Sequence, residues 1–314
     1  MKYQEKNIVC FGGGTGLPTL LSGLKHNPLF NVTAIVNMFD SGGSSGELRD
    51  RFGILPPGDV LKCLLALSKN EVYAKQILLK RIKNFKYPGH TGGNALLLGL
   101  QKIFGDYSMA IDAFSQILSV HGKVIPVTQE KAMICAEYTD ETIYKSETGV
   151  DIGIHEGKRI KKIFLEPEIP ASPTAIEAID SADIICIGPG SFYTSILSNF
   201  LPIGICAAIM KSKARIVFIA NFLTEGKGMQ NMYLEDIVKI VEEYIGRRLD
   251  YIIVNDIWPE ELLAKYTLES KYPIVSRSGD DKRLVEAELW QDKIIARHDS
   301  SCLADLITGL MSGF

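Results

Sequence analysis

The sequence has little that would mark a secreted, membrane-spanning or nucleic-acid-binding protein. Its six cysteines lie far apart, without a CxxC pair or zinc-ligand spacing, which disfavours a disulfide framework or a structural zinc site. The N-terminus lacks the apolar region of a secretory signal, and the longest apolar stretch, "LPIGICAAIM", is too short to span a bilayer. A net charge of −3 gives no reason to expect nucleic acid or an anionic membrane as a partner. We therefore expect a cytoplasmic protein with reduced, buried cysteines.

Motifs of common catalytic mechanisms are missing as well. There is no GxSxG elbow, no HExxH motif and no stripe of basic and aromatic residues, so hydrolysis by nucleophilic catalysis has no support. The composition, 46% hydrophobic and 23% charged, is that of an ordinary globular protein with a large core. A length of 314 residues allows two domains, but no Pro- or Ser-rich linker divides the chain. We expect a single domain over residues 1–314.

The order of the apolar segments predicts an α/β fold. A strand-like run, "NIVCF", is followed by glycines and a helical pattern, "LPTLLSGLK", and then by a second strand, "VTAIVNM". After several helical segments the alternation resumes, with "DIICIG", "ARIVFIANF" and "DYIIVND" as strands. Such alternation predicts a Rossmann-like, doubly wound, mostly parallel sheet in three layers. Residues 123–165 contain short extended runs without a helical pattern, which predicts a small β-rich antiparallel insertion.

The first candidate binding loop is "FGGGTGLP", directly after the first strand. Glycines at this place let backbone N–H groups approach a phosphate, and the following helix directs its positive end to the same point. The dinucleotide fingerprint GxGxxG is not met, because Leu17 stands where the third glycine should be, and no Walker A lysine follows. A phosphate site is favoured over a turn that serves packing alone. The residues concerned are Gly12, Gly13, Gly14, Thr15 and Gly16.

The second candidate is the long polar stretch "DSGGSSGELRDRFGILPPGD", residues 40–59. Its serines and glycines suit a backbone nest for an anion, and the residues concerned are Ser41, Gly42, Gly43, Ser44 and Ser45. Asp40 and Asp59 bracket the stretch, and carboxylates at such places hold a ribose hydroxyl or Mg²⁺. Alternatively, Asp59 is the N-cap of the next helix and the stretch is a solvated connection. Its length favours a functional loop.

Two further loops precede helices. In "YPGHTGGNALLLGL", Asn94 is a candidate N-cap and His90 is flanked by glycine, although His90 alone is better explained as a surface or packing histidine. In "IGPGSFYTSIL", a buried strand ends at Gly188, Pro189 and Gly190, and Ser191 caps the next helix. Loops that follow parallel strands gather at one edge of the sheet. Together they predict a nucleotide site, with NAD-dependent redox chemistry disfavoured by the failed fingerprint.

The chain resembles the CofD-like superfamily over nearly its whole length, and within it the bacterial gluconeogenesis factor (YvcK-like, UPF) branch. The motifs that carry this resemblance are, in chain order, "GGGTG", "D-x-GGSSG-x-LRD-x-x-GILPPGD" and "GPGS-x-YTSIL". The resemblance implies a three-layer, CofD-like fold with a nucleotide pocket at the strand ends. The enzymatic branch transfers a phospholactyl group from a guanosine diphosphate carrier to a deazaflavin alcohol with Mg²⁺. There, the aspartate matching Asp59 sits at the acceptor, and the loops matching Gly12–Gly16 and Gly188–Ser191 hold the phosphates.

The gluconeogenesis-factor branch implies instead a cytoplasmic regulator that binds UDP-sugars and supports cell-wall precursor supply and cell shape. In that branch a tyrosine and an arginine contribute to the nucleotide-sugar site, and their counterparts here are Tyr266 and Arg297. The expected ligand is a UDP-sugar, with GDP and NAD as alternatives and Mg²⁺ held by Asp40 and Asp59. The resemblance favours a regulator over an enzyme. A homodimer is expected from base rates, and a regulatory protein partner is a further candidate.

The chain also departs from the branch pattern. Ser41 stands where a second acidic residue is usual, and Glu47 and Leu61 stand where basic residues are expected. The branch segment "MTQxGET" is replaced by "LTEGKG", residues 223–228. Because Glu47 and Leu61 replace two cations, the loop at residues 40–59 attracts phosphate less strongly. The sequence thus predicts a divergent member whose ligand can differ from that of the branch.

Overall fold

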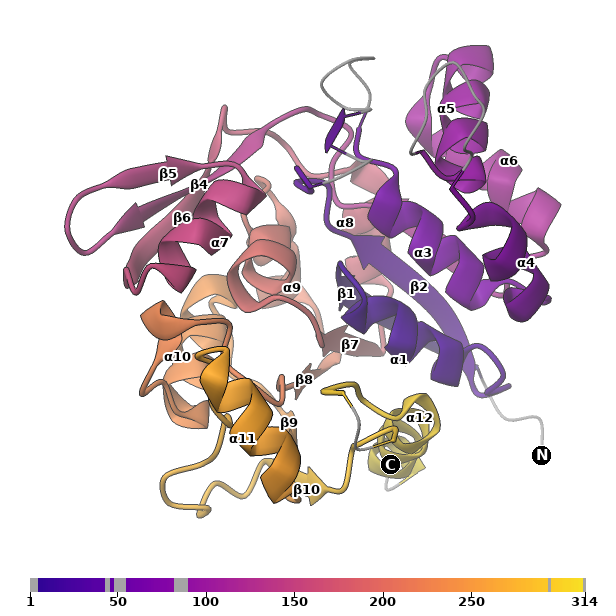
Figure 1. The fold of residues 1–314 in the computed structure, drawn as a ribbon. Coiled ribbons are helices and arrows are strands. Elements are labelled where there is room, and N and C mark those ends of the chain that lie inside the picture. Colours follow the sequence, from indigo (N-terminus) through magenta and orange to yellow (C-terminus); the bar gives the residue numbers. More distant parts are fainter. Residues whose placement is uncertain (1–4, 43–45, 48–54, 82–89, 293–294, 313–314) are drawn as a thin grey trace.

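A seven-stranded parallel sheet runs through the middle of the protein (Figure 1). The structure is a computed structural model, which describes residues 5–42, 46–47, 55–81, 90–292 and 295–312. The strand order is β10-β9-β8-β7-β1-β2-β3, and every pairing is parallel. The strands are β1 (Lys6–Gly12), β2 (Phe30–Val36), β3 (Lys123–Pro126), β7 (Ile184–Ile187), β8 (Arg215–Ile219), β9 (Tyr251–Asn255) and β10 (Leu284–Ala287).

Helices cover both faces of this sheet. On one face α1 packs against both α3 and α12, and α9 packs between α8 and α10 in a second group. The helices are α1 (Gly16–Leu24), α3 (Gly58–Leu67), α4 (Glu71–Leu78), α5 (Gly92–Phe104), α6 (Tyr107–Leu118), α7 (Glu147–His155), α8 (Pro173–Asp180), α9 (Ile205–Lys211), α10 (Leu234–Ile245), α11 (Glu260–Leu268) and α12 (Ser300–Ser312). The central strands are buried on both sides, which explains why β1 and β7 are nearly continuous apolar runs.

The order of the strands creates one point at which the winding of the chain reverses. From β1 the chain moves to β2 in one direction, and from β7 it moves through β8 and β9 in the other. Right-handed crossovers therefore put the connecting helices α1 and α9 on opposite faces. This confirms the prediction of a doubly wound, Rossmann-like sheet. In such sheets the loops on either side of the reversal separate and leave room for a ligand.

The predicted β-rich insertion is present as a three-stranded antiparallel sheet. Its order is β5-β4-β6, with β4 (Met133–Tyr138), β5 (Ile143–Lys145) and β6 (Ile160–Glu166). The prediction was wrong in two details, because Lys123–Pro126 is strand β3 of the main sheet and Glu147–His155 is helix α7. The sequence contains few indications of helix α7, because its buried apolar residues are sparse. At the helix start the Ser146 side chain accepts a bond from Gly149 N–H.

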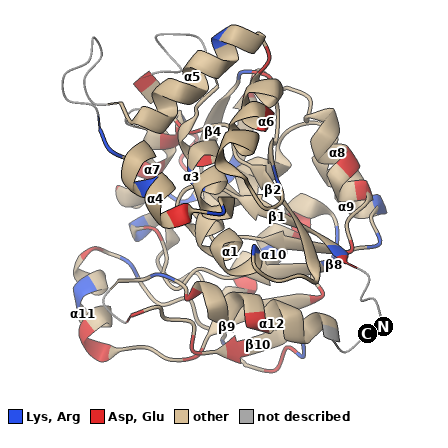
Figure 2. Cartoon of the chain, turned by 90° about the vertical axis from the view of Figure 1, so that its right-hand side faces the viewer, with Lys and Arg blue, Asp and Glu red and all other residues tan. Residues whose placement is uncertain are grey.

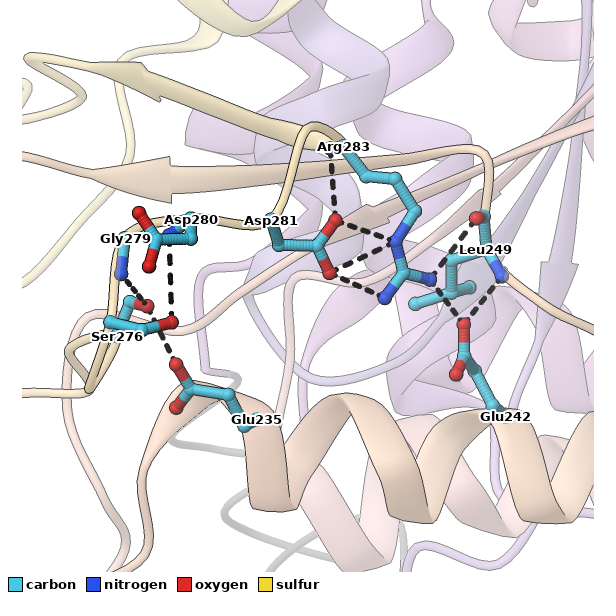
Figure 3. Close-up of polar contacts among 9 residues, drawn as sticks. Glu235, Glu242, Leu249, Ser276, Gly279, Asp280, Asp281 and Arg283 are labelled. Carbon is cyan, nitrogen blue, oxygen red and sulfur yellow. Dashed lines mark hydrogen bonds and ion pairs between the residues drawn. The ribbon is translucent and has the colours of Figure 1, made fainter.

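The edge strand β10 is held by a group of charged side chains (Figure 3). The Arg283 guanidinium donates to both oxygens of Asp281, to the Glu242 carboxylate on α10 and to the carbonyl of Leu249. Arg283 is largely buried, and bidentate charge-assisted bonds are among the stronger ones in proteins. This group fastens the segment before β10 to α10 and to the start of β9.

Charged residues of both signs are interspersed over the visible helices (Figure 2). This distribution agrees with a net charge of −3 and shows no face of one sign in that view. Among the residues that the structure describes, no helix is long and apolar enough to cross a membrane.

Packing of α1 against α12 predicts a position at which a methyl group cannot be added. A Cβ atom built on Gly23 would lie 1.9 Å from the carbonyl oxygen of Ser300, so Gly23→Ala forces the helices apart and costs about 1–3 kcal/mol. Gly99 of α5 is the matched control, because nothing lies within 4 Å of its built Cβ. Gly99→Ala should stabilise the fold by about 0.5–1 kcal/mol through helix propensity.

Urea unfolding midpoints of the two variants and the parent protein measure both effects. Equal midpoints for Gly23→Ala and Gly99→Ala would contradict the tight packing of α1 on α12.

Candidate functional site

A cavity of about 480 Å³ lies beside the loops after β1, β7 and β8, at the point where the winding reverses. Two other hollows, of about 350 and 660 Å³, are lined by residues toward the amino ends of β1, β2 and β3, where parallel sheets do not gather ligand-binding loops. Topology therefore selects the first cavity as the candidate site. The sequence-predicted residues that line it are Gly14, Thr15, Gly16, Pro189, Gly190, Ser191, Tyr266 and Arg297.

The first glycine loop places the start of α1 at the cavity. Gly14 has a positive φ of 62° and α1 begins at Gly16. The N-cap residue Thr15 makes no side-chain cap bond, and Thr15 and Gly16 both line the cavity. A Cβ atom on Gly16 would lie 2.3 Å from the carbonyl oxygen of Pro189. The loops after β1 and β7 therefore touch, and only glycine fits between them.

Three backbone donors at the loop after β7 bond within the protein. Gly188 N–H donates to Phe11 O at 3.0 Å, and Gly190 N–H donates to Asn221 Oδ1 at 3.2 Å. Phe192 N–H, at the start of the π-helix η1 (Phe192–Ile196), donates to Glu225 Oε1 at 2.7 Å. Ser191 occupies the N-cap position as predicted, but it makes no side-chain cap bond. The carboxylate of Glu225 caps this turn instead.

Asp40 and Asp59 are not among the residues that line the cavity. Asp59 is buried, and its carboxylate accepts from Gly14 N–H at 2.6 Å and from Lys62 Nζ at 2.9 Å. It lies within the first turn of α3 and is not the N-cap, which is Pro57. The Asp40 carboxylate accepts from Gly42 N–H at 2.8 Å. Asp59 thus supports the first glycine loop from behind.

The remaining predicted residues divide into two groups. Gly43, Ser44 and Ser45 lie outside the described residues. Those described but absent from the lining are Gly12, Gly13, Asp40, Ser41, Gly42, Asp59, His90, Asn94 and Gly188. His90 is buried at the start of α5, with Nε2 3.8 Å from Glu47 Oε1. The prediction of Asn94 as an N-cap was wrong, because Thr91 is the N-cap and its side chain accepts from Asn94 N–H at 3.2 Å.

The C-terminal part of the chain supplies another wall. Tyr266 on α11 is nearly buried, and its hydroxyl accepts a bond from Ala296 N–H at 2.8 Å. This bond ties α11 to the segment that carries Arg297, whose side chain is exposed at the cavity. Lys271 also lines the cavity and lies 5.6 Å above the Tyr266 ring. The structure thus brings together Tyr266 and Arg297, which the resemblance had associated.

Three carboxylates that the sequence reasoning missed line the same cavity. Glu147 and Asp151 lie four residues apart on α7, and Glu225 follows β8; we call these three residues the acidic wall. Residues spaced by four lie on one face of a helix, but this signal was invisible while the segment was interpreted as extended. Glu225 follows a buried strand in "FIANFLTEG", a position that was available to sequence reasoning.

Burial raises the pKa values of the acidic wall. The pKa of Glu225 rises to about 7 and that of Asp151 to about 6, in both cases chiefly because the groups are removed from water. Burial, followed by the nearby negative charge of Asp40, holds the pKa of Glu147 well above its usual range. The acidic wall is therefore only partly ionised at neutral pH, which lowers the repulsion that it exerts on an anion.

The raised pKa values predict that the ligand-free protein loses stability as the pH rises from about 6.5 to about 8. The folded chain keeps protons that an unfolded chain, with carboxyl pKa values near about 4, has released. Their contribution is fully present below the unfolded pKa and is lost as the pH passes through the folded value of about 7 for Glu225. Burial lowers the pKa of His298 to about 4. His298 therefore opposes the loss of stability with rising pH only below the range from about 6.5 to about 8.

Urea unfolding at stepped pH measures the slope. Glu225→Gln should flatten it, whereas Glu243→Gln at an exposed position of α10 should not. A stability that rises over this range in the parent protein would contradict the buried state of the acidic wall.

Known proteins resemble the chain over most of its length. The family model described as 2-phospho-L-lactate transferase CofD matches residues 8–291. A putative gluconeogenesis factor of Thermotoga maritima is 37% identical over 318 residues, which cover 96% of this chain and 98% of the relative. The gluconeogenesis factor of Bacillus subtilis is 38% identical, and the match covers 98% of this chain and 99% of that relative.

A solved structure shows the same architecture. The crystal structure of a UPF-family protein from Bacillus halodurans matches with a TM-score of 0.90 at 36% identity, over 97% of this chain and 99% of that chain. The family-model match includes both glycine loops and Tyr266, but it ends before Arg297. The chain therefore belongs to the CofD family and, within it, to the gluconeogenesis-factor branch.

Proposed function

We propose that the protein is a cytoplasmic, nucleotide-sugar-binding regulator of the gluconeogenesis-factor type, linked to carbon metabolism, cell-wall precursor supply and cell shape. The observation that carries the proposal is the cavity at the reversal point, which combines the uncapped first turn of α1 with Lys271 and Arg297. A helix start and two cations suit a diphosphate. A volume of about 480 Å³ lies within the usual range of ligand sites.

A magnesium ion shared by Asp40 and Asp59 does not fit the contacts of these residues. Lys62 and Gly14 N–H take the two oxygens of Asp59, and Asp40 bonds Gly42 N–H. In the part of the chain that the structure describes, no group of three His, Cys, Asp or Glu side chains is arranged to hold a metal. We therefore assign no role to a metal held by this pair.

The second candidate function is a transferase like that of the family model, which moves a phospholactyl-type group from a nucleoside diphosphate carrier to a hydroxyl acceptor. The match to the transferase family model favours it. In that reaction Asp59 would orient the attacking hydroxyl. Its present bonds to Gly14 N–H and Lys62 leave the carboxylate engaged with the protein, which supports the regulator over the enzyme.

Binding is tested by thermal-shift titration against UDP-sugars, GDP and NAD, each with and without Mg²⁺. A bound UDP-sugar should raise Tm by about 5 °C at a concentration about 100 times Kd. Arg297→Ala should weaken binding about tenfold, because it removes a cation from the cavity. Tyr266→Phe should weaken it less, because it keeps the ring and loses only the bond from Ala296 N–H.

Arg248→Ala is the matched control, since Arg248 is exposed and lies outside the cavity. If none of the three ligand classes shifts Tm, the nucleotide proposal is wrong.

Catalysis is tested with a guanosine diphosphate donor and a hydroxyl acceptor, followed by release of the nucleotide. We expect no turnover by the parent protein. Asp59→Asn should mainly lower stability, because the bond from Gly14 N–H and the ion pair with Lys62 are weakened. Turnover in the parent protein that disappears in a folded Asp59→Asn variant would instead establish the transferase.

A further inference from the structure

One layer of helices carries half of the exposed large apolar side chains in the described part of the chain. Helix α3 is buried along almost its whole length and packs against α4, α5 and α6, and α5 packs against both α4 and α6. These three outer helices lie on the side of the protein that faces the viewer in Figure 2. We call their outward surface the apolar face. Its exposed members are Val72, Tyr73, Ile77, Leu79, Leu96, Ile103, Phe104, Met109 and Ile117.

Helix α5 is apolar on its outer side as well as on its inner side. The inner side buries Gly93 and Leu97, whereas Leu96 and Ile103 of the same helix are exposed. A helix that is apolar all round is typical of a position buried on every side. Within the residues that the structure describes, the outer side of α5 is uncovered, although it has the composition of an interior surface.

Charge is scarce on these helices. Helices α4, α5 and α6, of 8, 13 and 12 residues, contain four charged side chains, Glu71, Lys75, Lys102 and Asp112. Glu71 and Lys75 form an ion pair with each other. The centres of interfaces between protein chains are depleted in charged residues and enriched in aromatic residues and methionine. Tyr73, Phe104 and Met109 give the apolar face this composition.

The apolar face is large enough for a stable contact between two chains. Its nine side chains have exposed fractions of 38–76%. At about 180 Å² for a fully exposed large side chain, they leave roughly 900 Å² of apolar surface in water. The largest apolar patch of a typical monomer is about 300–600 Å², and a standard interface takes about 800 Å² from each partner. The area is therefore that of a protein–protein interface.

The edges of the apolar face carry charges of opposite sign. Lys80 is exposed just after α4, and Asp112 is exposed on α6, one turn from Met109. A two-fold contact makes each interaction twice, so α4 of one copy against α6 of a second copy pairs Lys80 with Asp112 at two places. A contact of α4 with α4 would instead bring like charges together. The apolar face is therefore complementary to a second copy of itself.

A lipid surface suits the apolar face less well than a second copy does. Helices that bind anionic lipid are rich in Lys and Arg beside their apolar side, whereas α5 and α6 carry only Lys102 and Asp112 as charged residues. We propose that the apolar face binds a second copy of this chain in a two-fold dimer, with α4 of each copy against α6 of the other.

The oligomeric state of the full chain is the first test. Sedimentation equilibrium from about 0.1 to about 100 µM should show a dimer with a Kd of about 10 µM or below, because interfaces of this size range from micromolar to picomolar affinity. Ile103→Glu and Tyr73→Glu should each raise Kd about 30-fold or more, because they place a charge in the buried part of the contact. Leu268→Glu is the matched control and should leave Kd unchanged, because Leu268 is an exposed apolar residue of α11 outside the apolar face.

Charge reversal tests the arrangement of α4 against α6. Lys80→Glu and Asp112→Lys each put like charges opposite one another, so each should raise Kd about tenfold. The double variant restores opposite charges and should return Kd to within about threefold of the parent value. A double variant that dimerises as weakly as the single variants would overturn this arrangement.

Two results would overturn the dimer itself, with circular dichroism confirming the fold of every variant. One is a parent protein that stays monomeric up to about 100 µM. The other is a dimer that neither Ile103→Glu nor Tyr73→Glu weakens. Co-sedimentation with phosphatidylserine vesicles identifies the competing occupant: a monomeric protein that binds these vesicles, and loses this binding in Ile103→Glu, has a lipid surface in place of the second copy.

Discussion

The contact between the loops after β1 and β7 is the constraint on which the site depends. The two strands are neighbours at the point where the winding reverses. Gly16 lies so close to the Pro189 carbonyl that any side chain would clash with it. Because the loops touch at this point, the start of α1 and the start of η1 are held side by side. We call the start of α1 and the start of η1 the fixed pair, and every other wall of the cavity is built around it. A larger side chain at Gly16 would push these two helix starts apart.

Long-range hydrogen bonds hold the fixed pair in place. Asp59 supports the first loop through Gly14 N–H, and Asn221 and Glu225 support the second through Gly190 and Phe192 N–H. Satisfying buried backbone donors in this way is a general requirement of folded proteins. Its consequence here is that one loop keeps an uncapped helix start while the other presents a carboxylate. The cavity therefore has different chemistry on its two sides.

The C-terminal segment completes the site by lining the cavity with Tyr266, Lys271 and Arg297. Arg283 fastens the chain before β10, and the Tyr266 hydroxyl holds the segment that carries Arg297. These contacts join residues separated by 30 or more positions in most cases. The cations that line the cavity thus belong to a part of the chain that has no glycine loop of its own. The acidic residues of α7 belong to the antiparallel insertion.

The sequence by itself determined the alternation of strands and helices and the presence of glycine loops at strand ends, because periodicity and glycine spacing are local properties. It also carried enough of the motif order to assign the family. Only the tertiary structure decided which polar groups face the cavity. Asp40 and Asp59 were conspicuous, yet they are not among its lining residues, whereas Asp151 and Glu225 are. The physical reason is that a carboxylate is directed by its hydrogen-bond partner, and for Asp59 and Glu225 that partner lies 45 and 33 residues away.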